Sequence, residues 1–408
     1  MLPRLPTLDD VEVRGARVLV RVDFNVPLDS EGRILDDSRI AAHVPTIRDL
    51  VERGCAVTLI SHQGRPGEEG FTQLHAHAET LARYLGMEVK FVEDVIGPTA
   101  LAEIGKLGRG EVLLLDNVRL VSEELVEAPP EVHARSILVR KLAPLFDLFV
   151  FDAFATAHRS QPSIVGFPMV LRSVVGRVME REVDALRRIA DESQSPRVFV
   201  LGGAKVADTL KIVENLTRNK VADRVLTTGL VALVFHAARG GRVSEHVLKV
   251  LEGRGLLTLV PRARKLLLSG APVDVPVDYI VLKDDGTVDE CPASSVTGTP
   301  LDVGTYTVQM YAELMKEAKL VVMRGPAGYI EDPRFRSGTE ALLSAALRSG
   351  AFVVIGGGHL GAMLGSSRRE RVHVSTGGGA LLTALAGEEL PAVKALVESA
   401  KRFLNWRA

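Results

Sequence analysis

The chain has 408 residues, of which 46% are hydrophobic and 25% are charged. This composition is typical of a soluble globular protein with more than one domain. The formal net charge of -1 argues against a nucleic-acid-binding protein that relies on bulk electrostatics. The two cysteines, Cys55 and Cys291, are far apart in sequence and lack metal-ligand spacing, which argues against a disulfide framework and a zinc site.

The N-terminal residues include prolines and acidic side chains where a secretion signal would need an apolar core. No apolar run approaches the length of a membrane span. We therefore expect a cytoplasmic protein that has neither a nucleic-acid partner nor a membrane partner.

Short β-rich runs alternate with stretches of helical periodicity from end to end, as in α/β units built on parallel sheets. Helices are expected at residues 39–53, 74–85, 178–190, 208–218, 338–349, 380–385 and 390–405. A domain boundary is expected near residues 168–175. The charged helix at 178–190 is then either a connector between two lobes or an ordinary surface helix.

Four apolar segments in the first half each run into a polar loop. The segments cover residues 18–22, 56–60, 112–115 and 148–151. The loops and the helix after the first of them supply Asp23, Asn25, Arg39, His62, Gln63, Gly64, Arg65, Arg119 and Arg159. In an open parallel sheet, ligands bind at the carboxyl ends of the strands, and a guanidinium group can bind a carboxylate or phosphate through two bonds.

Each of these residues also has a simpler interpretation. Asp and Asn often make turns by bonding their own backbone, a single loop histidine is usually part of a turn, and a single arginine is usually half of a surface ion pair. Four polar strand ends at one edge of a sheet favour a site for a small polyanion instead.

In the second half, three apolar segments run into glycine turns at residues 202–205, 356–359 and 376–379. Such turns at the start of helices suit the phosphates of a nucleotide. Lys205 follows paired glycines, but the spacing is not that of a P-loop and no Ser or Thr comes next. A further turn at 325–331 reaches Glu331, which is either a solvated glutamate or a carboxylate that binds ribose hydroxyls.

The glycines Gly356, Gly358 and Gly361 also fit the spacing of a dinucleotide-binding turn. A nicotinamide-dependent dehydrogenase would need an acidic residue at the end of the next strand. That strand, at 371–374, runs instead into Ser375 and Thr376. The sequence therefore favours an enzyme that moves a phosphoryl group between two anions.

Taken in order, these segments resemble the phosphoglycerate kinase family over residues 20–390, most specifically at 152–159, 202–208 and 325–331. Residues 159–163 and 358–359 are similar to its archaeal branch. The resemblance implies an α/β fold of two Rossmann-like lobes, with parallel sheets flanked by helices, a long interdomain helix and a cleft between the lobes. It implies a 3-phosphoglycerate-binding domain at 1–172, a connecting helix at 173–192, a nucleotide-binding domain at 193–388 and a tail at 389–408 that packs on the first domain.

The resemblance assigns roles to individual residues. Substrate binding falls to Asp23, Phe24, Asn25, Arg39, His62, Gln63, Gly64, Arg65, Arg119 and Arg159. Nucleotide binding falls to Gly203, Lys205, Gly229, Glu331, Gly356, Gly357, Gly358 and His359. The turn facing the transferring phosphate comprises Thr376, Gly377 and Gly378. Arg39 and Lys205 would be catalytic, because their charges would lie against the equatorial oxygens of the moving group.

The implied reaction is reversible phosphoryl transfer from 1,3-bisphosphoglycerate to ADP, which gives 3-phosphoglycerate and ATP. In-line transfer is expected after hinge closure. The attacking oxygen is anionic in both directions, so catalysis needs positioning and charge neutralisation and no general base. We expect Mg²⁺ to be bound mainly through the nucleotide, without a ligand from the protein, and the enzyme to be a monomer.

Three positions depart from the family pattern. Thr209 stands where a second lysine is common, with Lys211 two residues further on. Arg324 replaces an asparagine, and His359 replaces an aspartate associated with the metal-bound nucleotide. A catalytically weak binding protein that keeps the fold is therefore a third interpretation.

Overall fold

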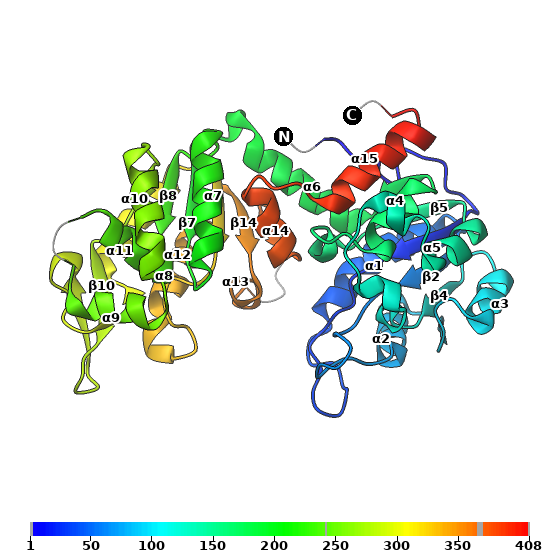
Figure 1. The fold of residues 1–408 in the computed structure, drawn as a ribbon, viewed down its shortest axis with the longest axis horizontal. Helices are drawn as coiled ribbons and strands as arrows, with labels where there is room; N and C mark the ends of the chain where they lie inside the picture. Colours follow the sequence, from blue (N-terminus) through cyan, green and yellow to red (C-terminus); the bar gives the residue numbers. More distant parts are fainter. Residues whose placement is uncertain (1–2, 241–242, 365–369, 407–408) are drawn as a thin grey trace. The chain divides into compact units, whose positions relative to one another are not determined.

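A computed structural model describes residues 3–240, 243–364 and 370–406. The chain forms two compact units (Figure 1). Unit 1 comprises Met1–Asp184 and Glu389–Ala408, and unit 2 comprises Ala185–Glu388. The division falls within helix α6 (Arg177–Ala190). The predicted boundaries at residues 172 and 192 stay predictions.

Unit 1 is built on a six-stranded parallel sheet with the order β3-β4-β2-β1-β5-β6. Its strands are β1 (Arg17–Arg21), β2 (Ala56–Ile60), β3 (Val89–Val92), β4 (Val112–Leu115), β5 (Leu148–Phe151) and β6 (Ser173–Val175). Every residue of β2, β4 and β5 is buried, as expected for a parallel sheet that is covered on both faces. The ends of β1, β2 and β5 are in register, since Arg21 pairs with Ile60 and with Phe151.

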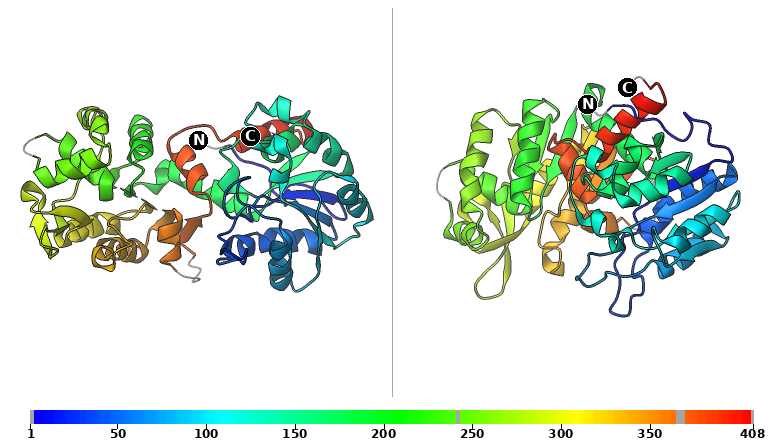
Figure 2. Two further views of the ribbon diagram at one scale, coloured as in Figure 1. Left: turned by 60° about the horizontal axis from the view of Figure 1, so that its bottom comes forward. Right: turned by 45° about the vertical axis from the view of Figure 1, so that its right-hand side comes forward.

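The helices of unit 1 come from both ends of the chain. They are α1 (Ser38–Glu52), α2 (His75–Leu85), α3 (Pro98–Lys106), α4 (Pro130–His133), α5 (Ile137–Leu142) and the C-terminal α15 (Pro391–Phe403). Helix α15 is held by a bond from the Ser399 hydroxyl to the Leu171 carbonyl (2.8 Å), and just beyond it the Trp406 indole donates to the Arg4 carbonyl (3.1 Å). Helix α15 and the described N-terminal segment accordingly lie near each other in both views of Figure 2.

Unit 2 contains a second six-stranded parallel sheet with the order β15-β14-β13-β7-β8-β9. Its strands are β7 (Arg197–Leu201), β8 (Arg224–Thr227), β9 (Val273–Asp274), β13 (Leu320–Arg324), β14 (Phe352–Gly356) and β15 (Val372–Ser375). The predicted fold class, two α/β domains whose parallel sheets are flanked by helices, is confirmed. The helices are α7 (Val206–Arg218), α8 (Gly229–Ala238), α9 (Glu245–Gly253), α10 (Val260–Leu268), α11 (Thr305–Lys316), α12 (Ser337–Arg348), α13 (Gly358–Ala362) and α14 (Gly378–Leu385).

Unit 2 also has a three-stranded antiparallel sheet, with the order β11-β10-β12, that was not predicted from the sequence. It consists of β10 (Asp278–Leu282), β11 (Val288–Pro292) and β12 (Thr299–Val303). The turn between β10 and β11 is closed by a bond from the Lys283 amide to the Thr287 carbonyl (2.9 Å). Asp285 and Gly286 form the Asp-Gly pair that is a common signal for a hairpin.

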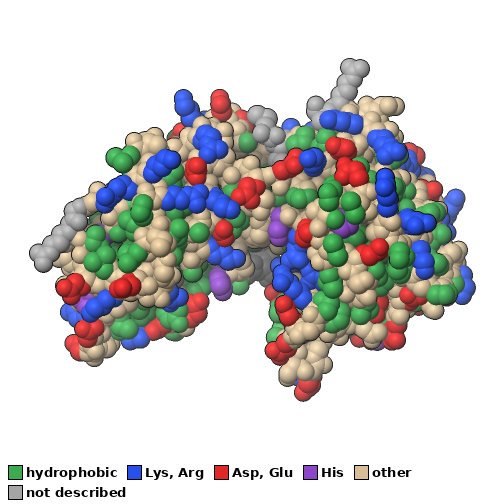
Figure 3. All heavy atoms as spheres, viewed as in Figure 1, with side chains coloured by type: hydrophobic (Ala, Val, Ile, Leu, Met, Phe, Trp, Pro, Cys, Tyr) green, Lys and Arg blue, Asp and Glu red, His purple; other side chains and the backbone are tan. Residues whose placement is uncertain are grey.

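The surface carries charges of both signs. Figure 3 shows lysine and arginine side chains interspersed with aspartate and glutamate over the face in view, in keeping with the formal net charge of -1. Within the described part of the chain, no helix combines the length and the apolar character that a bilayer crossing requires.

Candidate functional site

Four adjacent strands of unit 1, in the order β4-β2-β1-β5, run parallel. Their carboxyl ends therefore open at one edge of the sheet, and the polar loops predicted from the sequence lie there together. The Asp23 side chain is 5% exposed, and its Oδ2 accepts a hydrogen bond from Arg39 Nη1 at 2.5 Å. Asn25 Oδ1 accepts from the Gly64 amide at 2.9 Å, which joins the loop after β1 to the loop after β2.

His62 is buried among arginines. Burial lowers its pKa well below the usual range, and the nearby charges of Arg21, Arg119, Arg159 and Arg39 lower it further. The imidazole is therefore neutral, and its Nδ1, 3.8 Å from Asp23 Oδ1, does not form an ion pair. The result is a cluster of positive charges around a neutral histidine.

Arg21, the last residue of β1, is fully buried and was not selected from the sequence. Its Nη2 lies 3.2 Å from His62 Nδ1, and its Nε donates to the Ser163 hydroxyl at 2.9 Å. A guanidinium can only donate, so Nδ1 accepts and the proton of His62 is on Nε2. Glu124, also buried, accepts from the Ser163 amide (3.0 Å) and hydroxyl. A charged residue at the end of an apolar strand was the available signal.

The other arginines of this edge differ in exposure. Arg119 is buried and donates to the Gly64 carbonyl. Burial, with the charge of Arg159 next, lowers the pKa of Arg119 to about 10. Arg159 is half-buried, and its side chain makes no hydrogen bond or ion pair with the residues that the structure describes. The Arg65 side chain is 60% exposed and lies 3.9 Å from Glu68.

Three other predicted residues hold the loops in place. The Gln63 amide oxygen lies 2.9 Å from the Val26 amide and 3.1 Å from His77 Nε2, and its amide nitrogen donates to the carbonyls of Val26 and Gly70. Gly64 has φ +62, and an added Cβ would lie 2.6 Å from the Gly70 carbonyl. The Phe24 ring is buried in the core. The side chains of Gln63 and Phe24 therefore contact other parts of the protein, and their role in substrate binding stays a prediction.

A buried network behind this edge was also missed. His43 on α1 accepts from the Asp23 amide at Nε2 (3.1 Å), and its Nδ1 lies 2.9 Å from Asp152 Oδ2. Asp152 Oδ1 accepts from the amides of Val178 and Met179, at 2.8 and 3.2 Å, in the first turn of α6. Asp152 belongs to the segment 152–159 that carries the resemblance, and His43 follows Arg39 by one helical turn. These two positions were the features of the sequence that could have indicated the network.

In unit 2, three turns follow the carboxyl ends of β7, β8 and β13. The Gly203 amide donates to the Pro326 carbonyl (2.9 Å), and the Gly202 amide donates to the Arg324 carbonyl (2.8 Å). A Cβ at Gly202 would collide with Thr228 and Pro326. The turns can pack this closely because Gly202 and Gly203 have no side chains.

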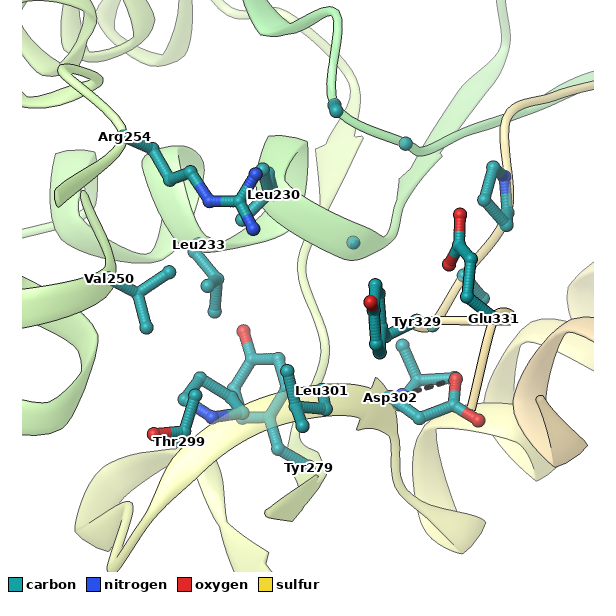
Figure 4. Close-up of a pocket in the computed structure, with 18 of the residues that line it drawn as sticks. Leu230, Leu233, Val250, Arg254, Tyr279, Thr299, Leu301, Asp302, Tyr329 and Glu331 are labelled. Carbon is teal, nitrogen blue, oxygen red and sulfur yellow. Dashed lines mark hydrogen bonds between the residues drawn. The ribbon is translucent and has the colours of Figure 1, made fainter. Parts of the chain in front are cut away.

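Beside these turns lies a cavity of about 490 Å³ (Figure 4). The predicted residues Gly203, Gly229 and Glu331 line it. Its other walls include the apolar side chains of Leu230, Leu233, Val250 and Leu301. Lys205, at the start of α7, is exposed outside this lining, and no side chain caps the helix. The Val206 amide donates to the Ala204 carbonyl (3.0 Å), whereas the amides of Ala207 and Asp208 have no partner among the described residues and can bind an anion.

The remaining predicted turns follow the next strands of the same sheet. The turn of Gly356, Gly357 and Gly358 follows β14, with His359 exposed, and the turn of Thr376, Gly377 and Gly378 follows β15. Gly357 has φ +108, and a Cβ at Gly356 would lie 2.5 Å from a Leu381 methyl. These turns share the sheet edge with Gly203 but do not line the cavity.

The departures from the family pattern have distinct surroundings. Thr209 is buried, and its hydroxyl donates to the Lys205 carbonyl (3.0 Å). Lys211 Nζ lies 3.2 Å from Glu388 Oε1. Arg324 is half-buried, burial lowers its pKa, and its side chain forms no hydrogen bond or ion pair within the described residues. The side chain of Arg324 is therefore free of hydrogen bonds to the described residues, although the charge of Asp208 acts on it, whereas Thr209 and Lys211 are bonded to other groups.

The described residues contain no cluster of three or more His, Cys, Asp or Glu side chains suited to a metal ion. The expectation that Mg²⁺ has no ligand from the protein stays a prediction.

The chain resembles known proteins over nearly its whole length. A family model described as phosphoglycerate kinase matches residues 8–388. The phosphoglycerate kinase of Saccharolobus solfataricus is 54% identical over 395 residues, covering 96% of this chain and 97% of the relative. That of Aeropyrum pernix is 50% identical, covering 98% and 97%. The crystal structure of phosphoglycerate kinase from Pyrococcus horikoshii OT3 matches with a TM-score of 0.89 at 39% identity, covering 98% of this chain and 100% of that one.

Proposed function

Because the chain belongs to the phosphoglycerate kinase family, we propose that the polar edge of unit 1 binds the glycerate ligand and the glycine turns of unit 2 bind the nucleotide. The family catalyses reversible phosphoryl transfer from 1,3-bisphosphoglycerate to ADP, so the enzyme is a glycolytic phosphotransferase with a carboxyl group as acceptor. This identity removes the nicotinamide-dependent dehydrogenase as an alternative.

The observation that carries the glycerate site is the set of guanidinium groups around neutral His62. The ligand carries a carboxylate and a phosphate, and Arg39, Arg65, Arg119 and Arg159 offer paired donors to both. His62 can donate from Nε2, because its Nδ1 accepts a hydrogen bond from Arg21. Asp23 and Asn25 would orient the ligand hydroxyl. Burial of several of these groups strengthens each charge contact, since water screens it less.

For the nucleotide, we propose that Glu331 binds the ribose and that Gly203, Lys205 and Gly229 hold the phosphates. The free amides of α7 support this assignment, because a helix start favours negative charge. Gly356, Gly357, Gly358 and His359 would continue the binding edge. The turn of Thr376, Gly377 and Gly378 would face the transferring group.

In the transfer step, the bond between the acyl oxygen and phosphorus breaks, and a bond forms between phosphorus and a terminal phosphate oxygen of ADP. The carboxylate leaves with the electron pair, and no proton moves. Arg39 and Lys205 would stabilise the charge on the equatorial oxygens. Mg²⁺ bound through the nucleotide would add positive charge at the phosphates. Hinge closure before transfer, a monomeric state and a cytoplasmic location stay predictions.

The proposal is tested by a coupled assay that follows ATP formation from 1,3-bisphosphoglycerate and ADP. We expect Arg39→Ala and Lys205→Ala each to lower kcat by about 10² to 10³, the usual cost of removing one charge-stabilising donor. The dissociation constants of 3-phosphoglycerate and ADP should change much less, because these contacts strengthen in the transition state.

Two matched variants serve as controls. Arg33→Ala removes an arginine whose side chain is 71% exposed and pairs with Asp29 and Glu31. Lys211→Ala removes the lysine that pairs with Glu388. Both should keep the parental kcat. If Lys205→Ala also kept it, or if Arg39→Ala weakened ligand binding as much as turnover, the corresponding catalytic role would be wrong.

A further inference from the structure

The cavity of unit 2 has two different sides. In Figure 4, Glu331 and Tyr329 lie toward one side of the view, and Leu233, Val250 and Arg254 lie toward the other. Tyr279, the second residue of β10, lies on the side of Leu233, and its hydroxyl points into the cavity. The walls around that hydroxyl are largely apolar, so the hydroxyl is a polar group in a mainly hydrophobic part of the cavity.

The Tyr279 hydroxyl is buried without a partner. The residue is only 2% exposed, and among the described residues its Oη has no hydrogen bond. Burial raises the pKa of Tyr279, so the hydroxyl keeps its proton and can donate. The nearest aromatic neighbour, His236, meets the ring edge-on with centroids 6.0 Å apart and makes no such bond.

A second buried tyrosine in unit 2 has a hydroxyl with hydrogen-bond partners. Tyr311 on α11 donates to the Thr227 carbonyl at 3.0 Å, and its Oη also lies 3.2 Å from the Asp274 carbonyl. Native proteins pair nearly all such groups, and an unpaired one in a cavity indicates a missing partner. Tyr279 differs from Tyr311 in that its hydroxyl faces a cavity large enough for a ligand.

We propose that the Tyr279 hydroxyl donates a hydrogen bond to a ring nitrogen of a purine base and so sets the base preference of the enzyme. This inference rests on the proposed nucleotide site. With the ribose at Glu331 and the phosphates at Gly203, the base extends into the apolar slot that holds Tyr279. A base that presents C–H at that point leaves the hydroxyl unpaired and is rejected.

The test measures dissociation constants by calorimetry on the full chain. Tyr279→Phe should weaken ADP binding by about three- to tenfold, the fold-change of one neutral hydrogen bond. The 1-deaza, 3-deaza and 7-deaza analogues of ADP each replace one ring nitrogen by C–H. One of them should bind the parental chain more weakly than ADP by the same factor, and should bind the Tyr279→Phe variant as tightly as ADP does.

Controls separate the base from the rest of the ligand. Tyr306→Phe alters a tyrosine that is 71% exposed on α11 and should leave every constant unchanged. Inorganic pyrophosphate, which has no base, should bind the parental chain and Tyr279→Phe equally.

The inference is overturned if the parental chain binds all three analogues as tightly as ADP, a result that needs no variant to fold. It is also overturned if Tyr279→Phe weakens ADP and all three analogues alike, which a purely structural tyrosine would do. A parental chain that binds neither ADP nor pyrophosphate would instead refute the proposed nucleotide site itself.

Discussion

Arg324, at the end of β13, adds a positive charge to the edge of the sheet where we propose that the nucleotide binds. Thr209 is buried and bonded to the Lys205 carbonyl, and Lys211 is paired with Glu388. Thr209 carries no charge, and Lys211 could reach a phosphate at the glycine turns only by breaking its contact with Glu388. Arg324 pairs with Gly356 where β13 runs beside β14. Its side chain is half-buried and makes no hydrogen bond or ion pair with the described residues. At the residue scale, Arg324 is thus the natural second cation beside Lys205.

We predict that Arg324→Asn lowers kcat by about ten- to a hundredfold, because a half-buried cation is weakly screened and stabilises developing charge strongly. The coupled assay gives kcat, and calorimetry gives the affinity for ADP. Arg336→Asn, which removes an exposed arginine paired with Glu340, is the matched control. Unchanged turnover in Arg324→Asn would mean that Lys205 and the main-chain amides suffice.

The site residues show which features of the site can be predicted from the sequence and which depend on contacts between distant segments. The strand ends that supply Asp23, His62, Arg119 and Arg159 could be predicted, because parallel strands bring their carboxyl ends to one edge. Which nitrogen of His62 carries the proton could not, since that depends on Arg21, a residue 41 positions away in sequence. The engagement of Lys211 by Glu388 is likewise a contact between distant segments, 177 residues apart.

At the scale of elements, Asp152 connects a loop to a helix. Its carboxylate lies within hydrogen-bond distance of donors on two helices, namely His43 Nδ1 and Thr46 Oγ1 on α1 and the amides of Val178 and Met179 on α6. The Asp23 amide must donate to His43 Nε2, so the proton of His43 is on Nδ1 and points at Asp152. The loop that holds Asp23 is thereby tied to the start of α6.

We predict that Asp152→Asn lowers the free energy of unfolding of unit 1 by about 3 kcal/mol, because an amide NH₂ would face donors that a carboxylate accepted. The affinity for 3-phosphoglycerate should fall with it, since the Asp23 loop loses its support. The affinity for ADP should not change. Denaturant unfolding and calorimetry measure these quantities.

Asp29→Asn alters a surface turn in the same unit, where the carboxylate accepts from Glu31 and Arg33, and is the control. If Asp152→Asn destabilised unit 1 no more than Asp29→Asn does, the capping role of Asp152 would be refuted.

Element positions were predicted well where the apolar pattern is strong. The strands β2, β4 and β5 have the predicted bounds, and α6 begins one residue before the predicted 178. The antiparallel sheet was missed because β11 is mostly exposed and so lacks a clear apolar run. Tyr279, on the neighbouring β10, was missed with it, so the inner wall of the cavity could not be derived from the pattern.

At the scale of the whole molecule, unit 1 is assembled from two segments that are distant in sequence. Helix α15 buries Ala392, Val393, Ala395, Leu396 and Ala400. The Ala392 amide donates to the Ala157 carbonyl, two residues before Arg159. The C-terminal helix therefore supports the loop after β5. Packing between the C-terminal helix and the N-terminal part of the chain cannot be predicted from local periodicity, because periodicity indicates a helix but not the segment that it packs against.

We predict that Leu396→Ala destabilises unit 1 by about 2 to 5 kcal/mol, the usual cost of removing a fully buried leucine side chain. The affinity for 3-phosphoglycerate should fall as unit 1 loosens, while calorimetric affinity for ADP at 25 °C should stay at the parental value, because the residues proposed to bind the nucleotide all belong to unit 2. Glu398→Ala, at an exposed position of the same helix, should change neither affinity. Equal loss of both affinities in Leu396→Ala would show that the two units do not respond separately, and unfolding would then have to be treated as one cooperative transition.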